Sequence, residues 1–166
     1  KHTPLFPHHE LVATRLLREP TLLAEIPPHP NLVSVIETIR TPGHFYLVEE
    51  FLDGYVTLEA LIGRMNINTP TSSAHKLPHD AAEKVFEQLV LALYAIHKPL
   101  RVCHRDVKPE NVLVHPETLQ LKLLDFGLAT HFSRSHAKLT TCCGSPAFHC
   151  PEIVTALSKP LGSVSY

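Results

Sequence analysis

The chain has 166 residues, enough for one domain and short for two. Its 15 Lys and Arg residues nearly balance its 16 Asp and Glu residues, and the formal net charge of −1 excludes a strongly basic nucleic-acid-binding surface or an acidic tail as the main feature. Hydrophobic residues make up 44% of the chain, so a core can form and we expect a globular protein.

The cysteines and the 13 histidines do not form a recognisable metal or disulfide pattern. The cysteines lack zinc-site spacing, and an adjacent pair rarely meets the Cα separation that a disulfide needs, so we expect reduced thiols. The histidines are scattered, which favours surface and core roles over metal binding. The four cysteines are Cys103, Cys142, Cys143 and Cys150.

No apolar stretch approaches the roughly 20 residues that span a bilayer, and no signal-peptide pattern opens the chain. Reduced thiols predict a cytoplasmic protein, with a nuclear location as the alternative. We therefore expect neither a membrane nor a nucleic acid as a partner.

The first predicted elements are a helix and a β-hairpin. Apolar residues recur at helical spacing over His9–Ile26, with a predicted kink at Pro20, and the prolines that follow end the helix. Runs rich in β-branched and aromatic residues cover Leu32–Arg40 and His44–Phe51. The Thr-Pro-Gly between these runs predicts a hairpin.

Two helices are predicted next. A short one covers Leu58–Met65, and the polar stretch Asn66–Lys76 predicts an exposed loop. Ala81–His97 has the clearest helical periodicity, and its nearly all-apolar second half predicts burial on more than one face. Asp80 is the predicted N-cap, with Glu83 three residues later in the position of a capping box.

Two polar clusters flank a second predicted hairpin. Its strands, Asn111–His115 and Leu119–Leu124, are joined by a Pro-Glu-Thr turn. One cluster, His104–Asn111, precedes the first strand, and the other, Asp125–Gly127, follows the second. Because a hairpin brings its two ends together, we expect Asn111 and Asp125 to converge on one point.

These residue types suit phosphate chemistry. An Asn oxygen with an Asp carboxylate is typical of a Mg²⁺ site shared with phosphate oxygens. Lys108 adds a compact positive charge that can follow a phosphoryl group, and Asp106 is placed to accept a hydroxyl proton. The alternative is that they are ordinary turn residues, since Asp, Asn, Pro and Gly favour turns.

The chain resembles the eukaryotic protein kinases along most of its length. His104–Asn111 is similar to the catalytic loop H-R-D-x-K-P-x-N, and Asp125–Gly127 is similar to the D-F-G triad. Gly144–Glu152 ends a stretch otherwise predicted as loop and resembles the end of the activation segment, with Cys-Pro-Glu in place of A-P-E. His29–Val33 resembles the turn before strand four, and Phe45–Leu52 resembles strand five and the hinge.

The resemblance implies a role for each matched residue. Asp106 would be the catalytic base, Lys108 would contact the γ-phosphate, and Asn111 would be the third catalytic residue. Asn111 and Asp125 would hold Mg²⁺. The residues implied in nucleotide binding lie in the hinge, the catalytic loop and the strands that follow it: Glu50, Leu52, Lys108, Glu110, Leu113 and Asp125.

The resemblance also implies a substrate class and a regulatory site. Lys108, followed by Pro-Glu, resembles serine/threonine-specific members, and Ser145 would steady the catalytic aspartate and this lysine. Thr141 matches the usual phosphorylation site, with Thr140 as its rival, and a phosphate there would pair with Arg105. An unmodified threonine in a loop is the alternative.

The chain departs from the family pattern in several places. Its six glycines are isolated, so no G-x-G-x-x-G motif is present. Lys1 has a workable spacing for the strand-three lysine, with Glu19 as its C-helix partner, although Pro20 favours a capping role for Glu19 instead. Glu49 is an unusual charged residue at the position that gates the nucleotide pocket, where it needs solvent or a partner.

The predicted fold class is α+β: a partial, bilobal protein-kinase-like fold with an N-lobe remnant over residues 1–52 and a partial C-lobe over residues 53–166. The predicted function is an ATP- and Mg²⁺-dependent serine/threonine protein kinase acting on protein hydroxyls. We expect both ends to be truncated and this chain alone to be inactive. The alternatives are a catalytically inactive kinase-like binding module and a small-molecule phosphotransferase.

Overall fold

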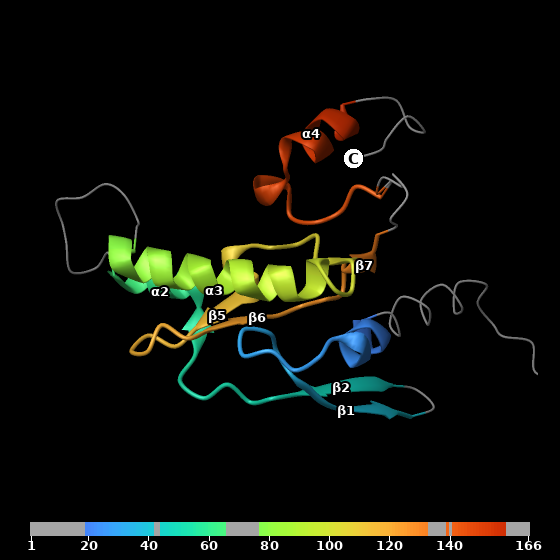
Figure 1. The fold of residues 1–166 in the computed structure, drawn as a ribbon, viewed down its shortest axis with the longest axis horizontal. Helices are drawn as coiled ribbons and strands as arrows, with labels where there is room; N and C mark the ends of the chain where they lie inside the picture. The colour runs from blue at the N-terminus through green and yellow to red at the C-terminus, as the bar shows by residue number, and fades with distance from the viewer. Residues whose placement is uncertain (1–18, 42–43, 66–76, 133–138, 140, 159–166) are drawn as a thin grey trace, which may run out of the picture.

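The computed structural model describes residues 19–41, 44–65, 77–132, 139 and 141–158, and shows small antiparallel sheets combined with helices (Figure 1). Residues 19–25 are helical. The elements that follow are β1 (Val35–Arg40), β2 (Phe45–Glu49), β3 (Val56–Thr57), α2 (Leu58–Met65), α3 (His79–His97), β4 (Val102–Cys103), the 3₁₀ turn η1 (Pro109–Asn111), β5 (Val112–Val114), β6 (Leu121–Leu123), β7 (Thr130–His131), the 3₁₀ turn η2 (Pro146–Phe148) and α4 (Pro151–Leu157).

The first predicted hairpin is confirmed with shorter strands. β1 and β2 pair antiparallel from Val35 opposite Glu49 to Arg40 opposite Phe45. Leu32 lies outside this pair and forms a parallel bridge with Leu123 of β6, which ties the hairpin to the second sheet. The predicted helix over His9–Ile26 is seen from residue 19 to residue 25, and its earlier residues lie outside the described part, as does the predicted loop over residues 66–76.

The second predicted hairpin is also confirmed. β5 and β6 pair antiparallel with Val112 opposite Leu123, and β3 adds a third strand through Val56 opposite Val114. The residues of β5 alternate: Val112 and Val114 are buried, whereas Leu113 between them is half-buried on the other face. α3 lies along this hairpin (Figure 1), so one sheet face is covered and the other is turned toward the β1–β2 hairpin.

α3 begins at His79, and the prediction that Asp80 caps it is wrong. Pro78 occupies the N-cap position, and no side chain caps the helix. The Pro78 carbonyl accepts the first helical hydrogen bond from the Ala82 N–H at 2.9 Å. Pro78 has φ −51° and ψ 148°, so the chain is extended at the proline and turns helical directly after it. Asp80 lies exposed in the first turn, where a negative charge complements the helix dipole.

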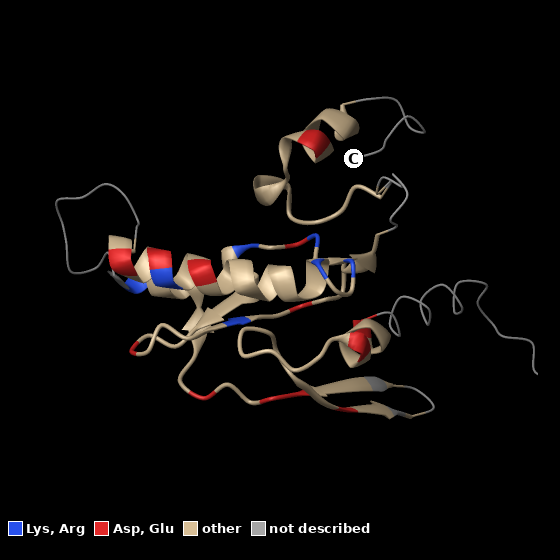
Figure 2. Ribbon diagram, in the orientation of Figure 1, with Lys and Arg blue, Asp and Glu red and all other residues tan. Residues whose placement is uncertain are grey.

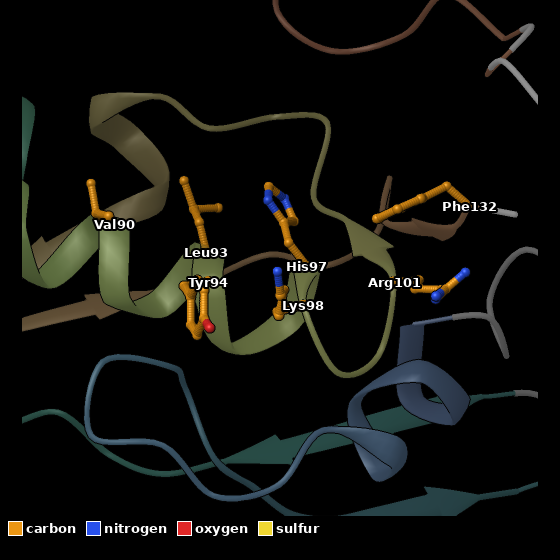
Figure 3. A pocket seen from close by; sticks show the side chains of 7 residues that line it. All are labelled: Val90, Leu93, Tyr94, His97, Lys98, Arg101 and Phe132. Carbon is orange, nitrogen blue, oxygen red and sulfur yellow. The ribbon is translucent and has the colours of Figure 1, made fainter. Parts of the chain in front are cut away.

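α3 is buried on one face only, contrary to the prediction for its second half. Ala92 and Ile96 are fully buried, whereas Val90 and Tyr94 are 47% and 60% exposed. The second half of the helix carries no Lys, Arg, Asp or Glu (Figure 2). A hollow opens beside it, and none of its lining residues belongs to the predicted site (Figure 3): Val90, Leu93, Tyr94, His97, Lys98, Arg101 and Phe132.

The stretch from Asp125 to Pro151 was predicted as loop but contains two short elements. β7 pairs with β4 through Val102 opposite His131 and Cys103 opposite Thr130, and η2 follows at Pro146–Phe148. A two-residue strand is too short to produce an alternating pattern, so only its distant partner defines it. Among the described residues, no helix is long and apolar enough to cross a membrane.

Candidate active site

The site is built around the carboxylate of Asp106, in the loop between β4 and η1. Its Oδ1 accepts hydrogen bonds from the Ser145 backbone N–H at 2.8 Å and the Ser145 hydroxyl at 2.9 Å. Its Oδ2 accepts from Lys108 Nζ at 2.8 Å and from Asn111 Nδ2 at 3.1 Å. Burial of Asp106 raises its pKa, but the hydrogen bonds from Lys108 and Ser145 outweigh this effect and hold the pKa below the usual value.

A buried histidine fixes the backbone on which Asp106 sits. His104 Nδ1 accepts the Asp106 backbone N–H at 3.3 Å, so its Nε2–H donates to the Leu124 carbonyl at 2.9 Å. Burial lowers the pKa of His104, which keeps the ring neutral in this arrangement. Its ring also packs edge-on against Phe126 at 4.9 Å between centroids. His104 thereby joins the catalytic-loop cluster to the Asp125–Gly127 cluster.

Asn111 and Asp125 lie at adjoining ends of the β5–β6 hairpin. The Leu124 N–H donates to the Asn111 carbonyl at 2.9 Å, immediately before Asp125. The Asn111 amide donates to the Asp106 carbonyl at 2.8 Å and to its Oδ2, so its own oxygen is the atom suited to bind a cation. Asp125 is exposed, and its negative charge acts to raise the pKa of Lys108 and the pKa of His104. Carboxylate and amide oxygens fit a hard cation such as Mg²⁺.

The backbone is in an unusual conformation at both clusters. Arg105 has φ +69° and Asp125 has φ +60°, a region that costs most residues about 1–3 kcal/mol. Arg105 Nε donates to the Leu128 carbonyl at 2.7 Å, which ties the catalytic loop to the chain after Gly127. Such conformations persist only where surrounding contacts enforce them, and they are frequent at functional sites.

Gly144 allows its segment to lie against the loop that contains Asp106. It has φ +99°, and a Cβ at this position would lie 2.5 Å from the Arg105 carbonyl oxygen. The next residue, Ser145, places both its N–H and its hydroxyl on Asp106, and its hydroxyl also accepts a hydrogen bond from Lys108 Nζ at 2.8 Å. These contacts agree with the expectation that Ser145 steadies the aspartate and the lysine.

Glu19 contacts the Asp125–Gly127 cluster. Its Oε1 accepts the Phe126 N–H at 2.8 Å, and its Oε2 lies 3.5 Å from where a Cβ on Gly127 would be. Burial raises the pKa of Glu19, and the charge of Asp125 adds to this rise. Burial likewise raises the pKa of Glu49, with repulsion from Glu19 and Asp125 in addition. Lys1, the predicted partner of Glu19, lies outside the described residues.

The predicted hinge lies against the β5–β6 hairpin. The Glu50 N–H donates to the Ser34 carbonyl at 2.9 Å, and its carboxylate accepts from Lys122 Nζ at 2.7 Å. Lys122 is directly opposite Leu113 across β5 and β6, so the hinge and Leu113 lie at the same sheet face. Leu52 is half-buried two residues further along.

The remaining predicted residues are less closely connected to Asp106. Glu110 is exposed in η1, and Thr141 is exposed in the activation segment, whereas Thr140 lies outside the described residues. The sequence analysis did not single out Lys122, because its contact with Glu50, 72 positions away, belongs to no local motif. Among the described residues, no group of three or more His, Cys, Asp or Glu side chains is arranged to hold a metal.

Comparison with known proteins agrees with these local features. Residues 6–164 match the protein kinase domain family. Serine/threonine-protein kinase ppk25 of Schizosaccharomyces pombe is 37% identical over 156 residues, which cover 94% of this chain and 34% of that protein. The SNF-related serine/threonine-protein kinase of Rattus norvegicus is 36% identical over 145 residues, covering 87% of this chain and 18% of that protein.

A plant relative extends the same similarity. CBL-interacting serine/threonine-protein kinase 15 of Arabidopsis thaliana is 36% identical over 148 residues, covering 88% of this chain and 30% of that protein. The chain thus spans about a third or less of the length of these relatives. The family match over nearly the whole chain confirms the resemblance seen in its motifs: the chain belongs to the protein kinase domain family and is homologous to serine/threonine kinases.

Proposed function

We propose that the protein containing this chain is a serine/threonine protein kinase that transfers the γ-phosphoryl group of ATP to a protein hydroxyl. The observation that carries this proposal is the Asp106 carboxylate, which accepts hydrogen bonds from Lys108, Asn111 and Ser145 in one cluster. Each of these residue types has a use in phosphoryl transfer, where positioning and charge stabilisation supply most of the rate enhancement.

Asp106 acts as the base toward the substrate hydroxyl. Its two oxygens already accept four hydrogen bonds, which is the full capacity of a carboxylate. An incoming hydroxyl therefore has to replace one of them. Its lowered pKa makes Asp106 a weak base, so its main contribution is to orient the hydroxyl, whose proton it accepts as the new O–P bond forms and the bond to the leaving ADP oxygen breaks.

Lys108 is the hydrogen-bond donor that the substrate hydroxyl replaces on Asp106. Its ammonium ends a long, flexible side chain that is 20% exposed, whereas Asn111, the other donor on Oδ2, is buried. Its hydrogen bond to Asp106 raises its pKa, so it remains a cation. By moving to the γ-phosphate, Lys108 frees Oδ2 for the hydroxyl and stabilises the charge on the transferred group.

Asn111 and Asp125 are the residues that would hold Mg²⁺, through the amide oxygen and the carboxylate. The bound ion would neutralise phosphate charge on ATP. Glu110 and Lys108 lie on the same loop and are proposed to face the phosphates, whereas Glu50, Leu52 and Leu113 are proposed to bind the adenine.

We also propose a division into an N-lobe remnant over residues 1–52 and a partial C-lobe over residues 53–166. The support is topological: β2 ends at Glu49, and the next strand, β3, joins the other sheet. A nucleotide bound at residues 50–52 would then lie where the two parts meet.

The proposal is tested by phosphate transfer from labelled ATP to a protein containing Ser and Thr. The Asp106→Asn variant of the full-length protein keeps the shape of the side chain and removes its charge, and we expect transfer to fall by at least about 10²-fold. Asp80→Asn is the matched control, because Asp80 is fully exposed at the start of α3 and we expect its activity to be unchanged.

Two outcomes would contradict the proposal. Unchanged phosphate transfer in Asp106→Asn would show that Asp106 is not the base. Absence of transfer in the wild-type protein, with ATP still bound, would favour the non-catalytic binding module instead.

A further inference from the structure

Lys122 is a buried lysine that forms an ion pair with Glu50 of the predicted hinge. It lies at the centre of β6, and only 9% of the residue is exposed. Its Nζ donates to Glu50 Oε1 at 2.7 Å and to the Leu32 carbonyl at 3.2 Å. A lysine this buried needs compensating partners, and here both come from the segment that contains β1 and β2.

The Glu50 carboxylate has a second hydrogen-bond donor, the backbone N–H of Ser34. Its Oε1 also accepts the Ser34 backbone N–H at 2.8 Å, and the Glu50 N–H donates to the Ser34 carbonyl at 2.9 Å. Burial raises the pKa of Glu50, but the hydrogen bonds from Lys122 and Ser34 more than offset this rise, so the carboxylate remains charged. Lys122 and Ser34 thus fix both the side chain and the backbone of Glu50.

The position of Lys122 relates its ion pair with Glu50 to the proposed nucleotide site. Lys122 is directly opposite Leu113 in the register of β5 and β6, and the two side chains share a sheet face. The Lys122–Glu50 pair therefore connects the hinge to the sheet face on which Leu113 lies. β1 and β2 form a sheet separate from β3, β5 and β6. Backbone hydrogen bonds join the two parts just before β1, where the Val33 N–H donates to the Leu123 carbonyl at 3.1 Å and the Leu123 N–H donates to the Asn31 carbonyl at 2.9 Å, and the Lys122–Glu50 pair adds a side-chain contact at the hinge itself.

We propose that Lys122 is a positioning residue for nucleotide binding, because its ion pair with Glu50 holds the hinge at the correct distance from the β5–β6 hairpin. This inference rests on the proposed function, since it assigns residues 50–52 to the adenine site. Lys122 itself does not touch the nucleotide. Without the pair, only a fraction of molecules has the hinge in the binding position, and the apparent Kd rises in proportion.

The test measures the Kd and KM for ATP and kcat at saturating ATP in the full-length protein. For Lys122→Met we expect the Kd and KM to rise about tenfold, which corresponds to a competent fraction of about one tenth. We expect kcat to change by less than about twofold, because saturating ATP selects the competent form. Lys122→Arg keeps the charge and the donors, and it is expected to restore most of the affinity.

Lys84→Met is the matched control. Lys84 Nζ donates to the Thr118 carbonyl at 3.2 Å, in the turn of the same β5–β6 hairpin, but it does not contact the hinge. Its loss therefore removes a lysine hydrogen bond to the hairpin without releasing Glu50, and we expect an unchanged Kd. A purely structural role for Lys122 would lower the unfolding midpoint and leave the Kd of the folded protein unchanged.

A second variant covers the case in which Lys122→Met does not fold. Glu50→Gln keeps the size of the side chain and an oxygen for Ser34 but removes the charge, and we expect the Kd for ATP to rise about threefold. A Kd within experimental error of wild type in Glu50→Gln, or in folded Lys122→Met, would overturn the inference and leave the proposed function intact. Failure of the wild-type protein to bind ATP would instead refute the proposed function.

Discussion

Gly144→Ala is the substitution that most sharply tests how the activation segment is held on the catalytic loop. The added Cβ would lie 2.5 Å from the Arg105 carbonyl oxygen, whereas Cβ atoms do not approach other atoms within 3.0 Å. The neighbouring atom belongs to the backbone, so the clash cannot be relieved by a side-chain rotation. Gly144 also has φ +99°, which alanine adopts only with strain.

The expected effect follows from the adjoining bonds. The two segments have to separate from 2.5 Å to at least 3.0 Å at Gly144, and the next residue donates the 2.8 Å and 2.9 Å hydrogen bonds to Asp106. A displacement of about 0.5 Å lengthens both bonds to about 3.3–3.4 Å and weakens them. Because misplacement by about 1 Å at a catalytic group costs about 10²-fold in rate, we expect this smaller displacement to lower kcat/KM by about tenfold. The strained backbone lowers the free energy of unfolding by about 1–3 kcal/mol.

The assay combines kcat/KM for phosphate transfer with urea unfolding. The matched control is Gly63→Ala in α2, where a Cβ would meet nothing within 4 Å and the backbone is helical. This control should keep its activity and gain up to about 1 kcal/mol in stability. A Gly144→Ala variant with wild-type kcat/KM would refute the reasoning, since Asp106 would then not depend on this close approach.

Three further predictions concern stability. Asn31→Ala removes the amide that donates to the buried Leu121 carbonyl at 3.1 Å, and the free energy of unfolding should fall by about 1–3 kcal/mol in a urea titration; a change under about 0.5 kcal/mol would contradict this. Phe126→Ala leaves a cavity at a fully buried position and should lower the free energy of unfolding by about 3–5 kcal/mol in the same assay; a loss under about 1 kcal/mol would contradict this. For Glu49, the folded-state pKa is raised, so its contribution to stability is greatest below its ordinary pKa of 4.5 and is lost as the pH rises through the raised value. Glu49→Gln should therefore be increasingly more stable than wild type as the pH rises from 4 to 8, and a constant difference over that range would show that Glu49 is not perturbed.

Elements with a strong local signal were predictable from the sequence. The short helix over Leu58–Met65 and the strands around Val112–Val114 and Leu121–Leu123 follow from apolar periodicity and from turn residues between them. β3, β4 and β7 were not, because each has two residues and exists only through a partner far along the chain, as in Val102 opposite His131. Local pattern cannot specify such pairs.

The start of α3 shows how two local signals compete. Asp80 and Glu83 have the spacing of a capping box, which predicts a helix starting after Asp80. Pro78 ends the extended chain two residues earlier, so the helix begins at His79 and Asp80 falls within its first turn. The proline constraint on the backbone outweighs the hydrogen bond that a side-chain cap would supply.

The site was predictable where its residues lie in one motif. Asp106, Lys108 and Asn111 are close in sequence and form one hydrogen-bonded cluster, and the hairpin pairing brings the backbone of Asn111 next to Leu124, the residue before Asp125. The bond from Phe126 to Glu19 and the pair of Lys122 with Glu50 join segments 107 and 72 residues apart. Such pairs depend on how the two sheets pack, which no single stretch of sequence encodes.

The central claim is that Asn111 and Asp125 together hold a cation that ATP shares. The most direct test is calorimetric titration of ATP into the full-length protein with and without Mg²⁺, for wild type and for Asp125→Ala. We predict that Mg²⁺ strengthens ATP binding to the wild type and that Asp125→Ala loses this gain while its Mg²⁺-free affinity stays within about threefold of wild type. An equal gain from Mg²⁺ in both proteins would contradict the claim.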